Sequence, residues 1–362
     1  MRPPAFAASC LVLLICLFDV SRACTSFCLE SADGPIFAAN LDLTTGDGHV
    51  FVNRRGIAKQ GYRLSTAGEA AQWTSRYGSV TFNLVGRELP WAGMNEAGLV
   101  MSTMQLNASR CPAPDERPPL SEAYLVQYLL DNCGSVREAL ELLPGVRLSQ
   151  QECRSHYLIA DEAGGCAAIE FLDGELVVHT GEAQPVRALA NAPYAAGVTF
   201  MERGVVPADN PGESVERVAA AASMMADYRP AGELSAVDQA FKCLTETVVA
   251  PRKWWSDIFH EPYTRWNVVF DVTRREIHFR TVATPNVRRL SLASFDFACG
   301  ASVLMLYVNA EIEGRVDEFF GSYDHDENLQ IFRKFCDQWG IEVSAEGAAS
   351  LIALFESFEC AP

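Results

Sequence analysis

The stretch Cys24-Thr25-Ser26-Phe27 decides how the rest of this sequence is interpreted. Residues 1–23 before it have the pattern of a secretory signal peptide, with a basic start at Arg2 and an almost entirely apolar run over residues 5–17. Ser21-Arg22-Ala23 then places small residues at the third and first positions before a cleavage point. Cleavage after Ala23 would make Cys24 the first residue of the mature chain.

An N-terminal cysteine combines a nucleophile and a base in one residue. Its free α-amine has an ordinary pKa of roughly 7.7–8.0, so a useful fraction is unprotonated near neutral pH. The amine can then take the thiol proton directly or through a water molecule, which a cysteine inside a chain cannot achieve with its amide nitrogen. The alternatives for Cys24 are a chance position at the cleavage point and a partner in a disulfide.

Composition and charge narrow the class of protein. The chain has 362 residues, a net charge of −17, 49% hydrophobic and 21% charged residues, which is ordinary for a globular protein. A surface of this sign repels nucleic acid and anionic membranes, so neither is an expected partner. No apolar run after residue 23 is long enough to span a bilayer, so we expect a secreted or periplasmic protein that leaves the membrane after leader cleavage.

The cysteines indicate an exported protein without a metal site. Twelve are present, and two lie in the leader, so setting Cys24 aside leaves an odd number and at least one further free thiol. The connectivity of any disulfides stays open at this stage. No Cys-x-x-Cys pair occurs and the six histidines are scattered, so we expect neither zinc nor another cofactor.

A β-hairpin is expected directly after Cys24. Residues 25–29 and 36–42 have strand patterns and are joined by a turn at 32–35. The second strand would bring Asn40 and Asp42 beside the N-terminus, both on one face, where the aspartate could hold an ammonium group. A solvated strand end is the alternative for this pair. Cys28 would lie about 13 Å from Cys24 along an extended strand, which excludes a disulfide between them.

The remaining elements predict an α+β fold. Their order is strands, two helices, strands, two helices, a hairpin and a helical tail, which suits antiparallel sheets covered by helices. We expect one hydrolase domain over residues 24–310 and an acidic helical C-terminal extension, residues 311–362, packed on it. The expected strands are 49–53, 73–82 with a break at Gly78, 99–106, 156–160, 166–171, 175–180, and the hairpin pair 265–271 and 276–280. The expected helices are 121–132 with Ser121 as its N-cap, 135–143 with a capping box, 215–228 and 235–243.

Several stretches together resemble one family. They are Cys24-Thr25-Ser26-Phe27, Asn40-Leu41-Asp42, residues 73–80, residues 93–99, the Asn191 segment and residues 264–271. This ordered set, over roughly residues 24–300, resembles the choloylglycine hydrolase family of linear amide C–N hydrolases, which includes penicillin V acylases and bile salt hydrolases. The resemblance implies an N-terminal-nucleophile hydrolase fold, a four-layer αββα sandwich, and a small-molecule acyl-amide substrate.

The resemblance also implies roles for individual residues. Cys24 matches the family nucleophile, which acts as base through its amine, and Asp42 matches the aspartate near the amine and thiol. Asn191 matches the asparagine whose side-chain amide donates to the oxyanion, and Gln105 falls where the family supplies a second donor through its backbone N–H. Arg217 fits a later family arginine, in the first turn of the helix expected at 215–228.

One residue departs from the family pattern. The position before Asn40-Leu41-Asp42 is usually basic in the family, but here it is Ala39. Loss of a cation beside the sulfur would leave the pKa of the Cys24 thiol higher, unless Arg217 or Arg265 takes its place. The alternative function is therefore a catalytically silent binding protein on the same scaffold. A papain-like enzyme with an internal cysteine and a distant histidine is the third hypothesis.

The substrate is left open by the sequence. Penicillin V, conjugated bile salts and N-acyl homoserine lactones are all handled by relatives in this family. The acyl and amine groups depend on pocket loops, which we expect at residues 57–68, 105–119 and 192–199. Relatives often form tetramers, so a homo-oligomer is compatible with the resemblance.

Overall fold

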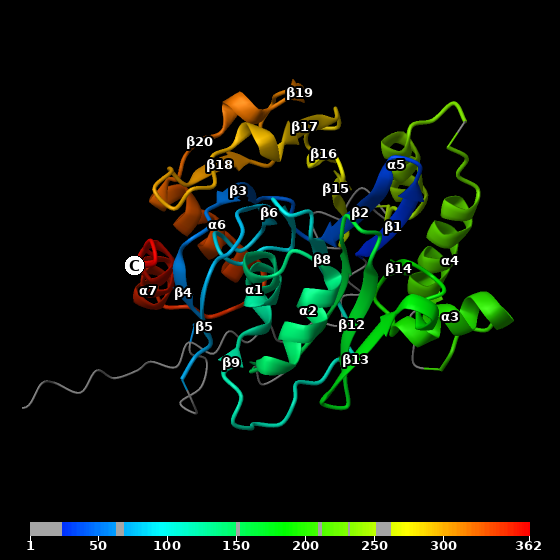
Figure 1. Ribbon diagram of the computed structural model, residues 1–362, viewed down its shortest axis with the longest axis horizontal. Coiled ribbons are helices and arrows are strands. Elements are labelled where there is room, and N and C mark those ends of the chain that lie inside the picture. The colour runs from blue at the N-terminus through cyan, green and yellow to red at the C-terminus, as the bar shows by residue number, and fades with distance from the viewer. Residues whose placement is uncertain (1–23, 63–68, 150–152, 209–211, 231, 251–261) are drawn as a thin grey trace, which may run out of the picture.

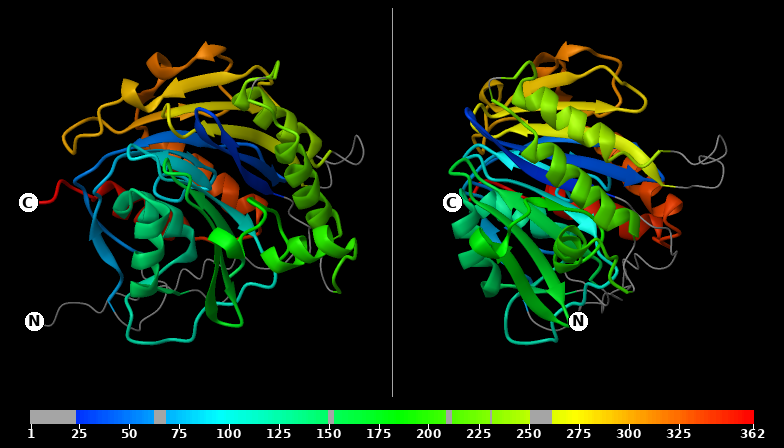
Figure 2. Two further views of the ribbon diagram at one scale, coloured as in Figure 1. Left: turned by 45° about the vertical axis from the view of Figure 1, so that its right-hand side comes forward. Right: turned by 90° about the vertical axis from the view of Figure 1, so that its right-hand side faces the viewer.

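The computed structural model describes residues 24–62, 69–149, 153–208, 212–230, 232–250 and 262–362. The expected signal peptide and residues 63–68 of the first expected pocket loop lie outside the described residues. Two large sheets are stacked on each other, with helices on both outer faces (Figures 1 and 2). This arrangement confirms the predicted α+β sandwich of two sheets between helical layers.

The first sheet is built on the hairpin that follows Cys24. Thr25 pairs with Asn40 across it, as the sequence predicts. Gly34 makes the turn with φ at +116°, and the Thr273 side chain fills the space where a Cβ atom would lie. Within the described residues the strand order is β14 (Ala188–Leu189), β1 (Thr25–Ser31), β2 (Gly34–Leu43), β15 (Tyr263–Asp271), β16 (Glu276–Thr281), β17 (Arg288–Ser291) and β19 (Gly314–Arg315).

The second sheet contains the meander predicted for residues 156–180. Its described order is β13 (Glu175–Thr180), β12 (Cys166–Leu172), β11 (Ser155–Ala160), β8 (Val100–Gln105), β7 (Ala92–Asn95), β6 (Ser79–Asn83), β3 (His49–Asn53), β18 (Leu304–Tyr307) and β20 (Gly321–Ser322). Two further pairs stand apart, β4 (Ala58–Gln60) with β5 (Gln72–Thr74), and β9 (Pro119–Leu120) with β10 (Arg147–Leu148). The strand expected at 73–82 therefore divides at Gly78 into β5 and β6.

Helices cover the outer face of each sheet. The helices α4 (Gly212–Ala226) and α5 (Ala236–Glu246) pack on β1 and β2, and α3 (Tyr194–Arg203) packs on α4. On the second sheet, α1 (Leu125–Asn132) contacts β7 and β8, and α2 (Val136–Leu142) follows it. The Ser135 cap is confirmed, because its side chain accepts from the Glu138 N–H. Ser121 is not the cap of α1, since a 3₁₀ turn at Glu122–Tyr124 precedes that helix.

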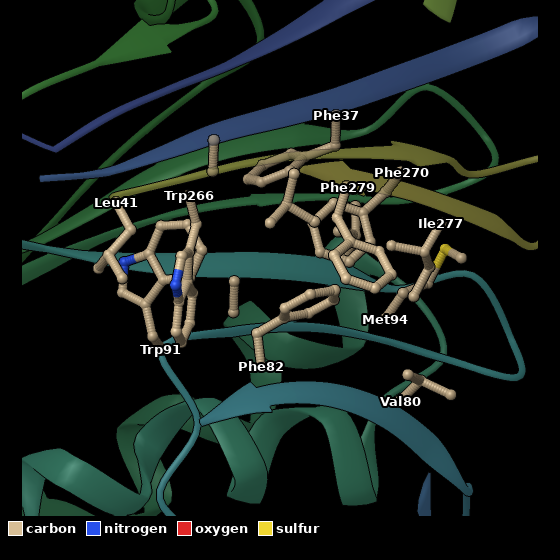
Figure 3. Packing of buried hydrophobic residues seen from close by; sticks show 14 of the residues in the cluster. Phe37, Leu41, Val80, Phe82, Trp91, Met94, Trp266, Phe270, Ile277 and Phe279 are labelled. Atoms are coloured by element: carbon tan, nitrogen blue, oxygen red, sulfur yellow. The ribbon is translucent and has the colours of Figure 1, made fainter. Parts of the chain in front are cut away.

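An aromatic core fills the space between the sheets. Phe82 contacts Trp266, Phe270 and Phe279 of the opposite sheet, with ring centroids 5.3–6.4 Å apart (Figure 3). Trp91 meets Trp266 at 6.1 Å. Burial of such large side chains favours the stacked arrangement strongly, and it joins β6 of one sheet to β15 and β16 of the other.

The C-terminal segment is helical only in part. Residues 311–324 form extended chain, a 3₁₀ turn and the short strands β19 and β20, so the expectation of a helical tail is wrong for them. The helices α6 (His325–Gln338) and α7 (Ala345–Glu356) follow, and the Asp324 side chain caps α6 by accepting from Glu327 N–H. Residues 324–327 are exposed, and Asp324 among them also has a structural role in starting α6.

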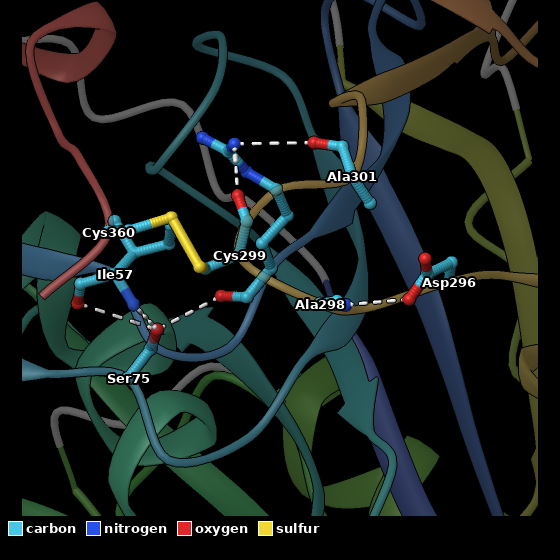
Figure 4. The surroundings of a disulfide bond; sticks show 8 residues. Ile57, Ser75, Asp296, Ala298, Cys299, Ala301 and Cys360 are labelled. Atoms are coloured by element: carbon cyan, nitrogen blue, oxygen red, sulfur yellow. Dashed lines mark hydrogen bonds between the residues drawn. A yellow bond between two sulfur atoms is a disulfide. The ribbon is translucent and has the colours of Figure 1, made fainter.

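Two disulfides form among the ten cysteines from Cys24 onward. They are Cys111–Cys153 and Cys299–Cys360, and the second joins the C-terminal end of α7's segment to the turn before β18 (Figure 4). The other six cysteines, Cys24 and Cys28 among them, form no disulfide among the described residues, which agrees with the odd count. In the part of the chain that the structure describes, no group of three or more His, Cys, Asp or Glu could hold a metal, and no helix is long and apolar enough to cross a membrane.

Candidate active site

Cys24 lies at the start of β1, with 4% of its surface exposed. It forms no disulfide among the described residues, so the disulfide alternative does not hold for it. The pairing of Thr25 with Asn40 places Cys24 opposite Leu41 of β2, one residue from Asp42. The hairpin therefore brings Cys24 and Asp42 to one place, as expected from the sequence.

Arg217 links the expected site residues around Cys24. It projects from the second turn of α4, because that helix begins at Gly212, earlier than predicted. Its Nη1 lies 2.7 Å from the Cys24 carbonyl oxygen and 3.9 Å from Asp42 Oδ2, and it also donates to the Thr25 hydroxyl. Its Nη2 donates to Asn191 Oδ1 at 3.0 Å. The guanidinium of Arg217 thus orients Cys24, Asp42 and Asn191 relative to one another.

Asp42 is buried, and one of its two carboxylate oxygens accepts no hydrogen bond from the described residues. The Thr264 hydroxyl donates to its Oδ1, whereas Oδ2 has no hydrogen-bond partner among the described residues. Burial raises the pKa of Asp42 to about 7, although the Arg217 charge and the Thr264 hydrogen bond both lower it. A buried carboxylate oxygen without a donor is costly. It is well suited to accept from an α-ammonium group that cleavage before Cys24 would create.

Asn40, the second polar residue expected beside the N-terminus, has a structural role. Its amide donates to the Leu244 carbonyl at 2.9 Å and to the Thr247 hydroxyl at 3.2 Å, and its oxygen accepts from Asn267 at 2.6 Å. These bonds join β2 to α5 and β15. Asn40 therefore positions the strand that carries Asp42.

Asn191 reaches the site from the segment after β14. Its backbone N–H donates to the Ser214 hydroxyl and its side-chain Nδ2 donates to the Gln105 carbonyl, both at 2.8 Å. A primary amide has two N–H donors, so one remains for another acceptor. The side chain is 9% exposed and held at both ends, because Arg217 binds its oxygen.

The backbone N–H of Gln105 faces away from β11. Leu106 N–H donates to the backbone carbonyl of Arg154, which lies on the side of β11. Thr103 N–H donates to the backbone carbonyl of Trp91, which lies on the side of β7. Alternate residues of an antiparallel strand face opposite neighbours, so Gln105 N–H points to the β7 side, beyond the end of the β7 ladder. Its carbonyl, which binds Asn191, lies on that same side. The structure thus brings the two expected oxyanion donors together.

Ala39 contributes no charge to the site. It is fully buried in β2, paired with Ser26 and Val268, and packs in the core between the sheets. Arg265, one of the two cations considered as a replacement, donates to the carbonyls of Leu43 and Thr44. Arg217 is the other candidate and contacts the Cys24 residue itself.

A cavity of about 160 Å³ opens beside Cys24. Of the expected pocket loops, only the one beginning at Gln105 contributes described residues to it. The segment 84–91, the start of β11 and helix α6 were not anticipated from the sequence. The cavity is lined by Cys24, Leu41, Leu43, Leu84, Val85, Leu89, Pro90, Trp91, Thr103, Met104, Gln105, Glu122, Ala123, Val126, Arg154, Ser155, Phe335 and Trp339.

The family model for linear amide C–N hydrolases of the choloylglycine hydrolase family matches residues 24–216. The chain belongs to this family. It is 24% identical over 324 residues to a penicillin V acylase of Pectobacterium atrosepticum, and the match covers 77% of this chain and 83% of that protein.

Solved structures of the choloylglycine hydrolase family share the fold. The penicillin V acylase from Agrobacterium tumefaciens superposes with a TM-score of 0.70 at 25% identity, over 83% of this chain and 98% of that one. A mutant of the conjugated bile acid hydrolase from Clostridium perfringens gives 0.63 at 15% identity, over 78% of this chain and 96% of that one. The predicted family and fold are therefore confirmed.

In this member of the choloylglycine hydrolase family, a buried His156–Glu170 pair holds the turn that carries Asn191. His156 Nδ1 lies 3.0 Å from Glu170 Oε1, and its Nε2 lies 2.5 Å from the carbonyl of Ala190. Glu170 Oε1 also accepts from Tyr194 N–H at 2.9 Å. Burial raises the pKa of Glu170, but hydrogen bonds from His156 and His179 outweigh it and lower the pKa to about 2. The pair therefore fixes both ends of residues 190–194.

The sequence patterns did not identify His156 and Glu170 as site residues. The sequence feature that could have identified them is a charged or polar residue inside each of two otherwise apolar strands, at 155–160 and 166–172. Such residues are rarely buried without a partner, which makes a mutual contact the natural interpretation. Their connection to Asn191 depends on the packing of β11 against β14, which no local pattern reveals.

Four internal cysteines have raised thiol pKa values, which makes them poor nucleophiles. Burial raises the pKa of Cys133 and of Cys336 to about 12, and that of Cys243 to about 11. The pKa of Cys28 is raised well above its ordinary value, first by its hydrogen bond with Cys166 and then by burial. Because the thiolate is the reacting species, these thiols disfavour the papain-like hypothesis.

Proposed function

We propose that the chain is exported, is cleaved after Ala23, and hydrolyses linear N-acyl amides with Cys24 as the nucleophile. One observation carries this proposal. The Arg217 side chain hydrogen-bonds to Cys24 and Asn191 and faces Asp42, while Cys24 borders an apolar cavity. Family membership independently supports amide hydrolysis of a small-molecule substrate.

The first step forms a thioester. The α-amine of Cys24 takes the thiol proton, the sulfur attacks the amide carbonyl carbon, and negative charge develops on its oxygen. The second N–H of Asn191 and the backbone N–H of Gln105 are the donors for that oxygen, each worth on the order of 3 kcal/mol. The ammonium then gives its proton to the leaving nitrogen as the C–N bond breaks, which releases the amine.

The second step returns the enzyme to its starting state. The amine takes a proton from water, and the resulting hydroxide attacks the thioester carbonyl. The C–S bond breaks, the carboxylic acid leaves, and the proton returns to sulfur. Throughout, Asp42 Oδ2 accepts a hydrogen bond from the amine, and Arg217 keeps Asp42, Cys24 and Asn191 in their relative positions.

The cavity supports an acyl group of moderate size. A cavity of roughly 150 Å³ in another protein holds one benzene molecule, and this one measures about 160 Å³. An aromatic acyl group such as phenoxyacetyl has this scale, whereas the four-ring skeleton of a bile acid is several times larger than benzene. We therefore place penicillin V-like amides ahead of conjugated bile salts.

Hydrolysis assays on the exported protein test the proposal. Penicillin V, a glycine-conjugated bile acid and an N-acyl homoserine lactone serve as substrates, with Cys24→Ala and Asn191→Ala as variants. We expect hydrolysis by the wild type, none by Cys24→Ala, and a loss of about 10²- to 10³-fold in kcat for Asn191→Ala, because one oxyanion donor is removed.

The same assay tests the alternative function, a catalytically inactive binding protein, which the presence of Ala39 suggested. Saturable binding of these amides without turnover by a chain that begins at Cys24 would contradict the proposed hydrolysis. It would identify a binding protein on the same scaffold, in which Arg217 does not make up for the missing cation.

A further inference from the structure

Two aromatic side chains of α6 and its C-terminal end line the cavity that contains Cys24. Phe335 and Trp339 lie four residues apart, on one face of the helix, with ring centroids 5.7 Å from each other. Both are partly buried, and both pack against the core between the sheets and against the core under the outer helices. We call this pair the α6 wall.

The α6 wall is joined to the loop that forms another side of the cavity. Asn328 of α6 is fully buried, and its Oδ1 accepts from Arg87 N–H at 2.9 Å. Gly86 has φ at +115°, and a Cβ atom there would lie 2.9 Å from the same oxygen. The neighbouring residues Val85 and Leu89 line the cavity. This contact therefore holds the loop against α6, the helix that carries the wall.

The C-terminal segment is also fixed at its far end. Cys360 is bonded to Cys299, and backbone bonds of 2.8 Å join Ala58 N–H to Glu359 and Ala361 N–H to Gly56 (Figure 4). His325 at the start of α6 meets Glu356 at the end of α7 at 2.7 Å. These contacts hold α6 in its position beside the cavity.

The family model does not extend to the wall, because its match ends at residue 216, before α6. The residues proposed to act on the substrate lie on β1, β2, β8, α4 and the segment after β14, whereas the wall lies on α6 and at its C-terminal end.

We propose that Phe335 and Trp339 are specificity-determining residues, which set the size of the acyl group accepted beside Cys24. The inference rests on the proposed function, since it concerns the acyl half of that substrate. Two packed aromatic rings on an anchored helix limit the space in the cavity, so they should exclude longer acyl groups and favour flat apolar groups of moderate size. A single methylene in such an apolar pocket changes kcat/KM by about 10- to 200-fold.

The experiment compares acyl preference in four proteins. These are the wild type, Trp339→Ala, Phe335→Ala and the control Phe319→Ala, which removes an exposed phenylalanine of the same segment, outside the cavity lining. kcat/KM is measured for amides of one amine with acyl groups from acetyl to dodecanoyl and with phenoxyacetyl. We expect both wall variants to raise the ratio of long- to short-chain kcat/KM at least tenfold, and Phe319→Ala to leave it unchanged.

A binding measurement separates this inference from the proposed function. The matching carboxylic acids, which are the expected products, are titrated calorimetrically into each protein in the Cys24→Ala background. The wall variants should shift the tightest-bound acid to a longer chain even if no amide is turned over. If Trp339→Ala shows a cooperative thermal transition, and is therefore folded, an unchanged binding profile would overturn the inference. If Trp339→Ala does not fold, Trp339→Leu replaces it, because leucine keeps an apolar side chain at this position. The binding profile of Trp339→Leu must then shift in the same direction.

Discussion

Asp42 and Arg217 illustrate how single residues prepare this site for its nucleophile. Both are buried, and burial disfavours the charged form of each, raising the pKa of Asp42 and lowering that of Arg217. Their mutual attraction across 3.9 Å offsets part of that cost. An α-ammonium group at Cys24 would give Asp42 Oδ2 the donor that it lacks among the described residues. We therefore expect cleavage before Cys24 to stabilise the site that it activates.

Glu122, a cavity residue, should make stability depend on pH. Burial raises its pKa from 4.5 to about 7, although hydrogen bonds from Ser155 and from the Arg154 backbone lower it. The folded protein therefore holds this proton more tightly than the unfolded chain. The contribution is fully present below pH 4.5 and is lost as the pH rises through about 7, by on the order of 3 kcal/mol.

Glu122→Gln isolates this contribution. Urea unfolding of wild type and variant between pH 4 and pH 8 gives the difference in unfolding free energy at each pH. We expect the wild type to lose stability relative to the variant as the pH rises. A difference that does not vary with pH would show that Glu122 titrates normally in the folded protein.

Among the elements, the turn at residues 190–194 carries Asn191, the proposed oxyanion donor. Glu170 binds one end through Tyr194 and the other through His156 and Ala190. We expect Glu170→Gln to act as the loss of a positioning residue, lowering kcat at least tenfold with little change in KM. Breaking a buried pair also costs about 3–5 kcal/mol of stability.

Two further variants distinguish positioning from general destabilisation. His179 meets the other carboxylate oxygen of Glu170 at 3.4 Å, so His179→Gln is a matched control that should retain kcat. Combining Glu170→Gln with Asn191→Ala should lower kcat no further than Asn191→Ala alone, because both act through one side chain. Fully additive losses in the double variant would contradict the positioning role.

Strong local patterns predicted the elements well, and weak ones did not. The hairpin after Cys24, the meander at 155–180 and the Ser135 cap follow from alternation, turn residues and capping chemistry. β7 was missed because Ala92-Gly93-Met94-Asn95 has low strand propensity and pairs only through its neighbours β6 and β8. The extended start of the C-terminal segment was missed because β19 and β20 are only two residues long, which is too short for a recognisable alternating pattern.

For the molecule as a whole, the family pattern identified the residues near Cys24 and did not identify the cavity. Cys24, Asp42, Asn191, Gln105 and Arg217 come together in the structure as expected. The contributions of α6 and of residues 84–91 depend on contacts between segments that lie more than 200 residues apart, such as Asn328 with Arg87. No local pattern encodes contacts of that range.

The disulfide Cys299–Cys360 should support the whole C-terminal segment. It closes a loop with a sequence separation of 61 residues, and removing such a bond typically costs about 2–4 kcal/mol. We expect Cys360→Ser to lower the free energy of unfolding by this amount in chemical denaturation. The double variant Cys299→Ser/Cys360→Ser should match it, because the bond is absent from both variants. Stability equal to the wild type in both would show that the α6–α7 packing holds the segment without the bond.

The most direct test of the account is the intact mass of the exported protein before and after brief incubation with an N-acyl amide, quenched in acid. The account predicts a chain that begins at Cys24 and gains one acyl group, and no such gain in Cys24→Ala. A chain that retains residues before Cys24, or an equal acyl gain in Cys24→Ala, would contradict an N-terminal cysteine nucleophile.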